Sequence, residues 1–585
     1  MVRIVAGSTF RRLSLIAALS LIGATVFSGT SVAASGGHDR FRASATDEGA
    51  GEGSELRTPA EYEEDAAEHP VTGSQALFSR CRFSPFAGDT GVYGALASWE
   101  HDVVVNDQPF AFADGTSCYE PQNESNIVIN PTNPNNIVSS SNDYRYGFGV
   151  CWAYVTTDRG AHWSNVVIPG WSNITGSGGV FTKTGCGGDP VMAFGPDGTL
   201  YFAALTYNFD KFPRTMSGVA VSSSKDGGLH WSAPKMVDYN AAGNFFQDKE
   251  WLGVAADGTV YLSWTRFYQG PLGLGYIKSP IVFSRSKDHG KNWTSVKEVS
   301  DATHPYNQGS QVGQAADGAI LIAYEGSQAT NYNFDQLVVA RSTDGGSSFT
   351  NTEVARVFDD LDCYPRQIGA QGRQTMTNEQ FRNSNFPSMA VDPTNGTIAI
   401  VWADDEGAGT CGGGGTTFSG TTSNQVKLVT SSNGTTWSAV RRITSSAPDK
   451  AYPSVGANAG KISIGFYTRE YSPTPTATDR RCGIMERDSV TGALVLPTDA
   501  GRAAAAVCLD WAVRTSRDDF ASQVRVTSES SNPYILFSGS FIGDYTGTAV
   551  DSSGRTVSVW TDFRGNPGLT PPNQDTMVGF ISAAH

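Results

Sequence analysis

The octapeptide SKDGGLHW at residues 224–231 decides the fold, because close copies of it recur along the chain. Three copies keep the Ser or Thr, the Asp, the Gly and the final aromatic residue: TTDRGAHW at 156–163, SKDHGKNW at 286–293 and STDGGSSF at 342–349. A fifth copy, TSSNGTTW at 430–437, has lost the acid, and a sixth at 516–520 is frayed. Asp and Ser side chains bind turn amides, Gly allows a positive φ, and the aromatic ring packs back onto a sheet. Each copy therefore predicts a β-hairpin whose aspartate is structural.

A pair of short apolar strands precedes most of these hairpins. The first strands of the pairs begin at Ser125, Pro190, Glu250, Ser310, Pro387, Pro453 and Thr546. Strand pairs and hairpins that alternate every ~55 to 90 residues predict four-stranded units in radial array, which is an all-β β-propeller. We expect seven blades, with six as the alternative. The last unit lacks a hairpin, so a strand from residues 76–118 is expected to complete it.

The amino-acid composition favours short strands, and the net charge argues against a nucleic-acid partner. The 585 residues include 65 Gly and 11% aromatic residues, which suits short strands and tight turns. The net charge is −15 and the pI is about 5.0. Because such a chain repels phosphate backbones, we expect no nucleic-acid partner.

The amino terminus has the features of an export signal. Arg3, Arg11 and Arg12 precede an apolar run at 13–27, and small residues at 32–34 offer a cleavage site. We therefore predict a signal peptide at 1–34, a disordered acidic leader at 35–75 and a propeller domain at 76–585. The protein is expected to be secreted and extracellular, without stable insertion in a membrane.

Eight cysteines fit an exported protein with disulfide bonds. They are Cys81, Cys118, Cys151, Cys186, Cys363, Cys411, Cys482 and Cys508. None lies in a Cys-x-x-Cys pair, so no zinc site is predicted. We expect near neighbours in sequence to pair.

Polar residues recur at equivalent ends of the predicted strands, and radial symmetry should bring them to one mouth of the central channel. Acids and tyrosines precede the innermost strands: Glu124, Asp189, Asp248, Glu250, Tyr452 and Tyr545. Arginines follow the partner strands: Arg145, Arg266, Arg469 and Arg564. Neighbouring acids raise one another's pKa and arginines lower them, which can set up an acid and a base in one pocket. The alternative is that these charges form salt bridges between blades.

The hairpins resemble the Asp-boxes (BNR repeats) of the sialidase-like superfamily, and the resemblance covers roughly residues 120–582. It implies a propeller fold and, for a sialidase, a tyrosine nucleophile activated by a glutamate, an aspartate acid/base and three arginines for the substrate carboxylate. Tyr545 in the segment DYTGTAVD at 544–551 resembles the family's tyrosine-led strand. Gly309 stands where the activating glutamate belongs, and Glu325 stands where an arginine belongs. The segment at 123–125 also lacks the family's Arg-Ile-Pro.

The resemblance and the mouth residues together predict a secreted sialidase-like glycoside hydrolase that acts on terminal sugars of glycans, acidic sugars included. Tyr545, Glu250 and Asp248 would carry the chemistry, with Asp189 and Glu124 next in line. The four arginines and Tyr452 would hold the sugar. No cofactor is expected, and calcium among the acids is the alternative.

Three other functions remain open at this point. One is a polysaccharide lyase, in which Tyr452 or Tyr545 acts as base beside Arg469. Another is a different exo-glycosidase on the same propeller. The third is a propeller that binds glycans or proteins without catalysis.

Overall fold

The computed structural model describes residues 102–585 with gaps. The gaps fall at 106–109, 112–116, 119–120, 145–149, 209–215, 271–275, 330, 359–363, 365, 368–372, 406–421, 446, 477, 488–493, 496, 499, 535–540 and 565–573. The predicted signal peptide, the leader and Arg145 lie outside the described residues, as do Cys81, Cys363 and Cys411.

Seven four-stranded antiparallel sheets form the blades of a β-propeller, which confirms the predicted fold and decides between seven blades and six. Blade 1 contains β4 (Gln122–Ile129), β5 (Ile137–Asp143), β6 (Cys151–Thr156) and β7 (Ser164–Ile168). Blade 2 contains β8 (Gly185–Phe194), β9 (Leu200–Asn208), β10 (Met216–Ser224) and β11 (Lys235–Asn240). Blade 3 contains β12 (Phe245–Val254), β13 (Val260–Gln269), β15 (Ile281–Ser286) and β16 (Lys297–Glu298), with β14 (Tyr276–Lys278) paired to β13.

The remaining blades repeat this order. Blade 4 contains β17 (Tyr306–Gln314), β18 (Ile320–Gln328), β19 (Asn331–Ser342) and β20 (Thr350–Val357). Blade 5 contains β23 (Ser388–Val391), β24 (Ile398–Asp405), β25 (Asn424–Ser431) and β26 (Arg441–Arg442). Blade 6 contains β27 (Lys450–Asn458), β28 (Lys461–Thr468), β31 (Asp510–Thr515) and β32 (Val524–Arg525). Blade 7 contains β33 (Gly547–Val550), β34 (Thr556–Asp562), β35 (Asp575–Ile581) and, outermost, β1 (Asp102–Val104).

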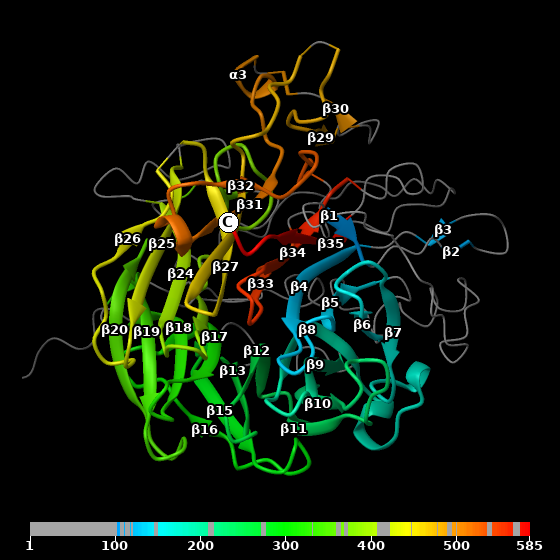
Figure 1. Cartoon of the computed structure of the whole chain (residues 1–585), viewed down its shortest axis with the longest axis vertical. Coiled ribbons are helices and arrows are strands. Elements are labelled where there is room, and N and C mark those ends of the chain that lie inside the picture. The colour runs from blue at the N-terminus through cyan, green and yellow to red at the C-terminus, as the bar shows by residue number, and fades with distance from the viewer. Residues whose placement is uncertain are drawn as a thin grey trace, which may run out of the picture. The chain divides into compact units, whose positions relative to one another are not determined.

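The ring of blades is closed at two levels. Each innermost strand contacts the innermost strand of the next blade, and β33 contacts β4. At the outer edge β1, from the start of the described chain, pairs with β35 near its end, and Figure 1 shows the blue strand beside the red one. The expectation that residues 76–118 complete the last blade is therefore confirmed.

The hydrophobic core is divided among the spaces between blades. The described residues form seven apolar clusters, one between each pair of neighbouring blades. Between blades 6 and 7, Trp511 stacks on Trp560 with ring centroids 5.7 Å apart. Because each blade buries both faces against its neighbours, the innermost strands are held in fixed positions around the axis.

The repeated octapeptides form turns between the third and fourth strands, as predicted. In the second copy, Oδ1 of Asp226 accepts hydrogen bonds from the amide of His230 at 2.9 Å and from the hydroxyl of Ser224 at 2.9 Å. The amide of Gly228 donates to the same hydroxyl at 2.9 Å, and Gly228 has a φ of 101°. In the fifth copy Asn433 accepts from the amides of Thr435 and Thr436, each at 2.9 Å, so an amide oxygen replaces the lost acid.

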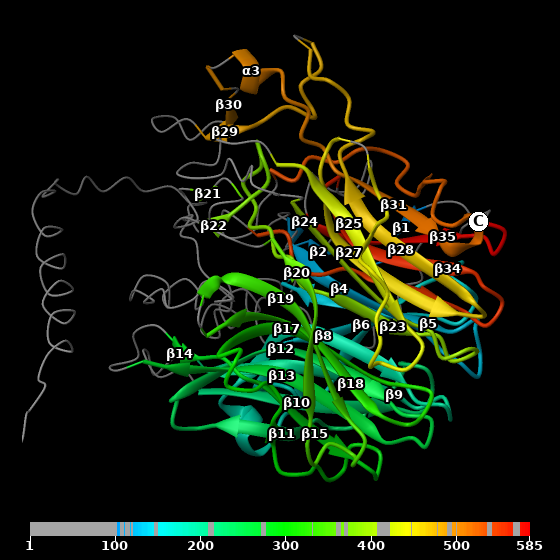
Figure 2. The same ribbon diagram turned by 90° about the vertical axis from the view of Figure 1, so that its left-hand side faces the viewer.

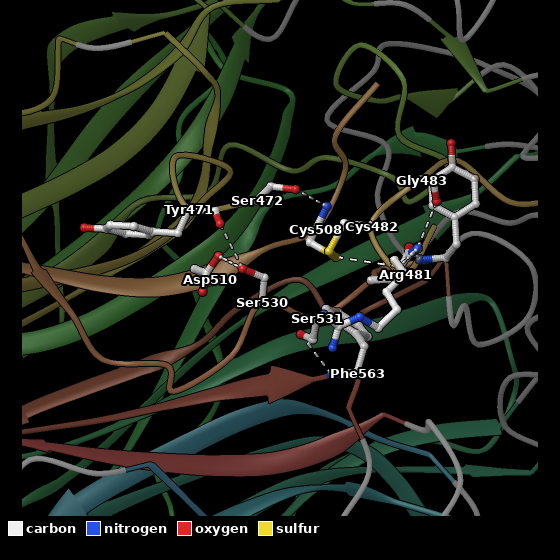
Figure 3. The surroundings of a disulfide bond; sticks show 12 residues. Tyr471, Ser472, Arg481, Cys482, Gly483, Cys508, Asp510, Ser530, Ser531 and Phe563 are labelled. Carbon is white, nitrogen blue, oxygen red and sulfur yellow. Dashed lines mark hydrogen bonds between the residues drawn. A yellow bond between two sulfur atoms is a disulfide. The ribbon is translucent and has the colours of Figure 1, made fainter. Parts of the chain in front are cut away.

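Two disulfide bonds lie in the described part of the chain, Cys151–Cys186 and Cys482–Cys508, and both join near neighbours in sequence as expected. The second closes a long connection between β28 and β31. The amide of Cys508 donates to Oγ of Ser472 at 3.0 Å, which ties the bridge to the end of β28 (Figure 3).

Short elements outside the blades complete the described structure. They are β2 (Phe110–Ala111), β3 (Ser117–Cys118), β21 (Arg366–Gln367), β22 (Arg373–Gln374), β29 (Glu486–Arg487), β30 (Leu494–Val495), α3 (Ala500–Ala503) and three 3₁₀ turns, η2 (Asn173–Thr175), η3 (Gly179–Thr182) and η6 (Ser516–Asp518). Figure 2 shows α3, β29 and β30 together beyond the ends of the blade strands. Among the described residues, no helix has the length and apolar character needed to cross a bilayer.

Candidate functional site at the central channel

The innermost strands carry bulges at equivalent positions. In blades 1, 2, 3, 4 and 6 the pairing with the second strand skips two residues of the first strand. The first skipped residue has a left-handed backbone: φ is 55° at Glu124, 57° at Asp189, 50° at Lys249, 66° at Gly309 and 45° at Tyr452. This conformation costs roughly 1–3 kcal/mol for a residue other than glycine, so the surrounding structure must enforce it. We had expected the strands to begin after these residues, but ladder pairing resumes on their amino-terminal side.

Lys249 is the centre of a buried ion cluster. Its Nζ lies 2.9 Å from Oε1 of Glu124, 3.2 Å from Oδ2 of Asp189 and 2.8 Å from Oδ2 of Asp544. All four side chains are at most 3% exposed. A cation held by three carboxylates joins blades 1, 2, 3 and 7 across the channel and stabilises charges that would be costly to bury alone.

Arg382 extends the cluster from the connection between blades 4 and 5. Its Nε and Nη2 donate to the two carboxylate oxygens of Asp544 at 2.9 and 2.7 Å, a bidentate contact. The hydroxyl of Tyr452 donates to the carbonyl of Arg382, and Phe381 packs beside the Tyr452 ring. This connection therefore covers part of the channel.

Amides position the acids of the cluster. Nδ2 of Asn142 donates to Oε2 of Glu124 at 2.9 Å, and its Oδ1 accepts from the backbone amide of Asp189 at 2.8 Å. Nε2 of Gln308 donates to Oδ2 of Asp248 at 2.8 Å. Asp248 is therefore oriented by the neighbouring blade.

Glu250 and Tyr545 differ from the other central groups. Glu250 is 2% exposed, and neither of its carboxylate oxygens has a hydrogen-bond partner among the described residues. The hydroxyl of Tyr545 is buried without a hydrogen-bond partner among those residues, while its ring is half-buried. The rings of Tyr545 and Trp251 pack edge to face with their centroids 6.2 Å apart. Nζ of Lys249 lies 5.7 Å from the centroid of the Tyr545 ring. Both side chains line one pocket, together with residues of blades 3 to 7.

Burial determines the protonation of these two groups. Burial, aided by the charges of Asp248 and Glu124, holds the pKa of the Glu250 carboxyl well above its usual range, against the opposing effect of Lys249. Burial and the charges of Glu124 and Asp189 likewise raise the pKa of the Tyr545 phenol. Burial thus favours the un-ionised form of both groups.

The described arginines that we expected to hold the sugar are engaged elsewhere. Arg266 binds Asp238 on the outermost strand of blade 2, with Nη2 and Oδ2 2.5 Å apart. Arg469 binds Asp449, and its Nη1 lies 3.5 Å from Glu379. Arg564 binds Asp102 and Asp562 at the outer part of blade 7. These three arginines therefore form salt bridges within the protein, which was the alternative to sugar binding.

Gly309 cannot be exchanged for the glutamate of the sialidase pattern without rearrangement. A Cβ atom at this position would lie 2.5 Å from Cγ of Phe386, and the φ of 66° is unfavourable for any side chain. Phe386 thus occupies the space into which that glutamate would extend.

A metal site is not supported among the described residues. No three His, Cys, Asp or Glu side chains in that part of the chain are grouped to hold an ion. The ammonium of Lys249 lies among the acids that were considered for calcium, so these residues do not fit a bound cation.

Three charged residues of the site, Lys249, Asp544 and Arg382, were not among the predicted site residues. Lys249 lies in register with Glu124 and Asp189 in the repeat, and that alignment could have identified it as their counter-ion. Arg382 lies in a connection that belongs to no repeat, so the pattern contained no signal for it.

Comparison with known proteins finds similar solved structures at low sequence identity. No family model matches this sequence, and no curated protein matches it. Among solved structures, a protein of unknown function from Dyadobacter fermentans is 14% identical over 67% of this chain and 93% of its own, with a TM-score of 0.39. The GH93 α-L-arabinofuranosidase of Fusarium graminearum is 13% identical over 63% and 92%, with a TM-score of 0.36. The intramolecular trans-sialidase from Ruminococcus gnavus is 12% identical over 67% and 94%, with a TM-score of 0.36.

Proposed function

We propose that the protein is a secreted glycoside hydrolase whose reacting sugar binds at the central channel, beside Glu250 and Tyr545. The observation that carries this proposal is the pairing of an unpartnered, buried carboxyl with an unpartnered phenol in one pocket. Enzymes keep a carboxylic acid un-ionised by burial so that it can protonate a leaving group near neutral pH.

In this mechanism Glu250 donates its proton to the glycosidic oxygen as the bond to the leaving group breaks. We assign Asp248, two residues earlier on β12, as the second carboxylate of the usual glycosidase scheme; it is buried and is not among the residues that line the pocket. Tyr545 lines the same pocket and would contact the bound sugar. Glu124 and Asp189 act indirectly, because their carboxylates hold Lys249.

True sialidase activity has less support than glycoside hydrolysis in general. Arg266, Arg469 and Arg564 each hold a neighbouring acid, and Gly309 is packed against Phe386. The same engagement of Arg469 with Asp449 removes the charge-neutralising partner that a lyase would need beside Tyr452. A non-catalytic glycan-binding propeller is the second candidate, and it is favoured by the complete pairing of these arginines.

The test is hydrolysis of a panel of fluorogenic glycosides by the wild type, Glu250→Gln and Tyr545→Phe. Loss of the general acid should lower kcat on the active substrate by ~10²–10⁴-fold. Glu298→Gln, an exposed acid on β16, and Tyr239→Phe, a half-buried tyrosine on β11, are the matched controls and should keep full activity. Full activity in both site variants would show that the site is wrong. A wild type that hydrolyses no member of the panel would favour the binding propeller.

A further inference from the structure

The pocket beside Glu250 and Tyr545 has an aromatic wall. Its lining includes four aromatic side chains, Trp251, Phe386, Tyr452 and Tyr545. The rings of Trp251, Phe386 and Tyr545 are only half-buried, so the pocket is open to solvent. Flat aromatic faces bind the apolar C–H face of a sugar ring and tolerate many hydroxyl arrangements at its edge.

Several other polar groups of the pocket make hydrogen bonds within the protein. Oγ of Ser310 donates to Ser263 at 3.0 Å, and Oε1 of Gln311 accepts from the amide of Met389 at 2.6 Å. The hydroxyl of Thr546 donates to the carbonyl of Tyr452 at 2.9 Å. These hydrogen bonds hold the three side chains in place around the pocket.

The formal charges at the pocket are compensated as well. Lys249 is surrounded by three carboxylates, and Asp544 accepts from both Lys249 and Arg382. A further anion near Lys249 would have to compete with Glu124, Asp189 and Asp544, all of which are buried and acidic. Among the described residues, each cationic side chain at the centre of the channel is therefore already ion-paired, and none is available to bind a ligand carboxylate.

The Glu250 carboxyl and the Tyr545 hydroxyl are buried without a hydrogen-bond partner among the described residues, and burial favours the uncharged form of each. We propose that the pocket selects a neutral, hydroxylated sugar ring and rejects sugars that carry a carboxylate. The inference rests on the proposed function for the location of the sugar, and it goes beyond it by naming the class of sugar. It also departs from what the sialidase resemblance implies.

Matched pairs of sugars test this selectivity without any variant. Titration calorimetry with the full chain compares methyl glucoside with methyl glucuronide and methyl galactoside with methyl galacturonide. Methyl arabinofuranoside and the methyl glycoside of N-acetylneuraminic acid extend the neutral and acidic groups. At least one neutral glycoside should bind, and the carboxylate counterparts should bind about tenfold or more weakly, which corresponds to ~1.4 kcal/mol.

Variants then locate the binding site. Tyr545→Phe removes one hydroxyl and should weaken binding of the neutral sugar, whereas Tyr239→Phe, on β11 of blade 2, should leave it unchanged. A second pocket variant, Trp251→Phe, retains an aromatic wall of smaller area and should weaken binding without removing a hydrogen bond. If neither pocket variant alters the affinity, the pocket is not the binding site and the inference is overturned.

The outcomes separate this inference from the proposed function. Binding of neutral sugars without hydrolysis of any glycoside would uphold the selectivity and contradict the glycosidase. Preferential hydrolysis or binding of sialosides or uronides would overturn the selectivity while leaving a glycosidase in place. Failure of every neutral glycoside to bind at millimolar concentration would also overturn the inference.

Discussion

Nζ of Lys249 lies 2.8 Å from Oδ2 of Asp544, and this contact links the third blade to the seventh across the central channel. The two residues are far apart in the chain, and each also holds a second partner of opposite charge. The ion cluster therefore helps to hold the ring of blades together, and its removal should lower the stability of the whole propeller.

Replacement of Lys249 by Met should destabilise the protein strongly. The change leaves three buried carboxylates without their common cation, and breaking a buried ion pair from one side costs about 3–5 kcal/mol. Chemical denaturation followed by tryptophan fluorescence measures the loss. The exposed Lys291→Met is the control and should change the free energy of unfolding by no more than about 0.5 kcal/mol. Equal stability of the two variants would contradict a structural role for the cluster.

Gly309→Ala should destabilise more than Gly258→Ala. Both glycines have a left-handed backbone, with φ of 66° and 83°, so both variants carry the conformational cost of an alanine in that region. Only at Gly309 does the added Cβ approach Phe386 at 2.5 Å, whereas nothing lies within 4 Å at Gly258. Overpacking costs typically 1–3 kcal/mol, so the difference in unfolding free energy between the variants should be about that size. No difference would mean that Phe386 moves aside easily.

Asp226→Ala should lower stability without lowering activity. Its carboxylate binds the amide of His230 and the hydroxyl of Ser224 in a turn between the third and fourth strands, and each lost bond costs about 1 kcal/mol. The channel residues lie on the innermost strands, so kcat on an active glycoside should be unchanged. The exposed neighbour Lys225→Ala serves as control. A large fall in kcat at full folding would show that the turn contributes to the site.

Lys461 should make stability rise with pH in the alkaline range. Burial, with the nearby charge of Arg517, lowers the pKa of Lys461 to about 8 from 10.5. Between these values the unfolded chain binds the proton and the folded protein does not, so the free energy of unfolding increases as pH rises from about 8 to 10.5. The difference in stability between the wild type and Lys461→Met should therefore shift in favour of the wild type over that interval. A difference that stays constant with pH would contradict the lowered pKa, and the exposed Lys287→Met provides the reference.

The repeated part of the fold could be predicted because each hairpin carries its own local chemistry. Ser224, Asp226 and Gly228 satisfy their turn whatever surrounds it, so the same letters predict the same structure at every copy. The fourth strand of the seventh blade is β1, whose three residues have little pattern of their own and gain order from pairing with β35. Such a strand depends on tertiary context rather than on propensity.

The candidate site could be predicted in part. Register alone was enough to group Glu124 and Asp189, because the innermost strands share one axis, and Glu250 directly follows Lys249, the residue in register with them. The ends of the second strands are less constrained, and Arg266 extends to an outer strand of the neighbouring blade rather than toward the axis. Arg382 comes from an insertion without a repeat, so only the folded chain reveals its contact with Asp544.

The pairing of Val104 with Met577 has a consequence for how the chain folds. Because β1 precedes the first blade in sequence and β35 belongs to the last, their pairing requires both parts of the chain. A nascent or truncated chain that lacks one of these strands therefore has an unpaired strand edge in blade 7. Entropy of loop closure makes this pairing slow relative to the formation of single sheets. Loss of either terminal strand would thus leave the apolar cluster of Val103, Ile127 and Val578 open to solvent and prone to association with other chains.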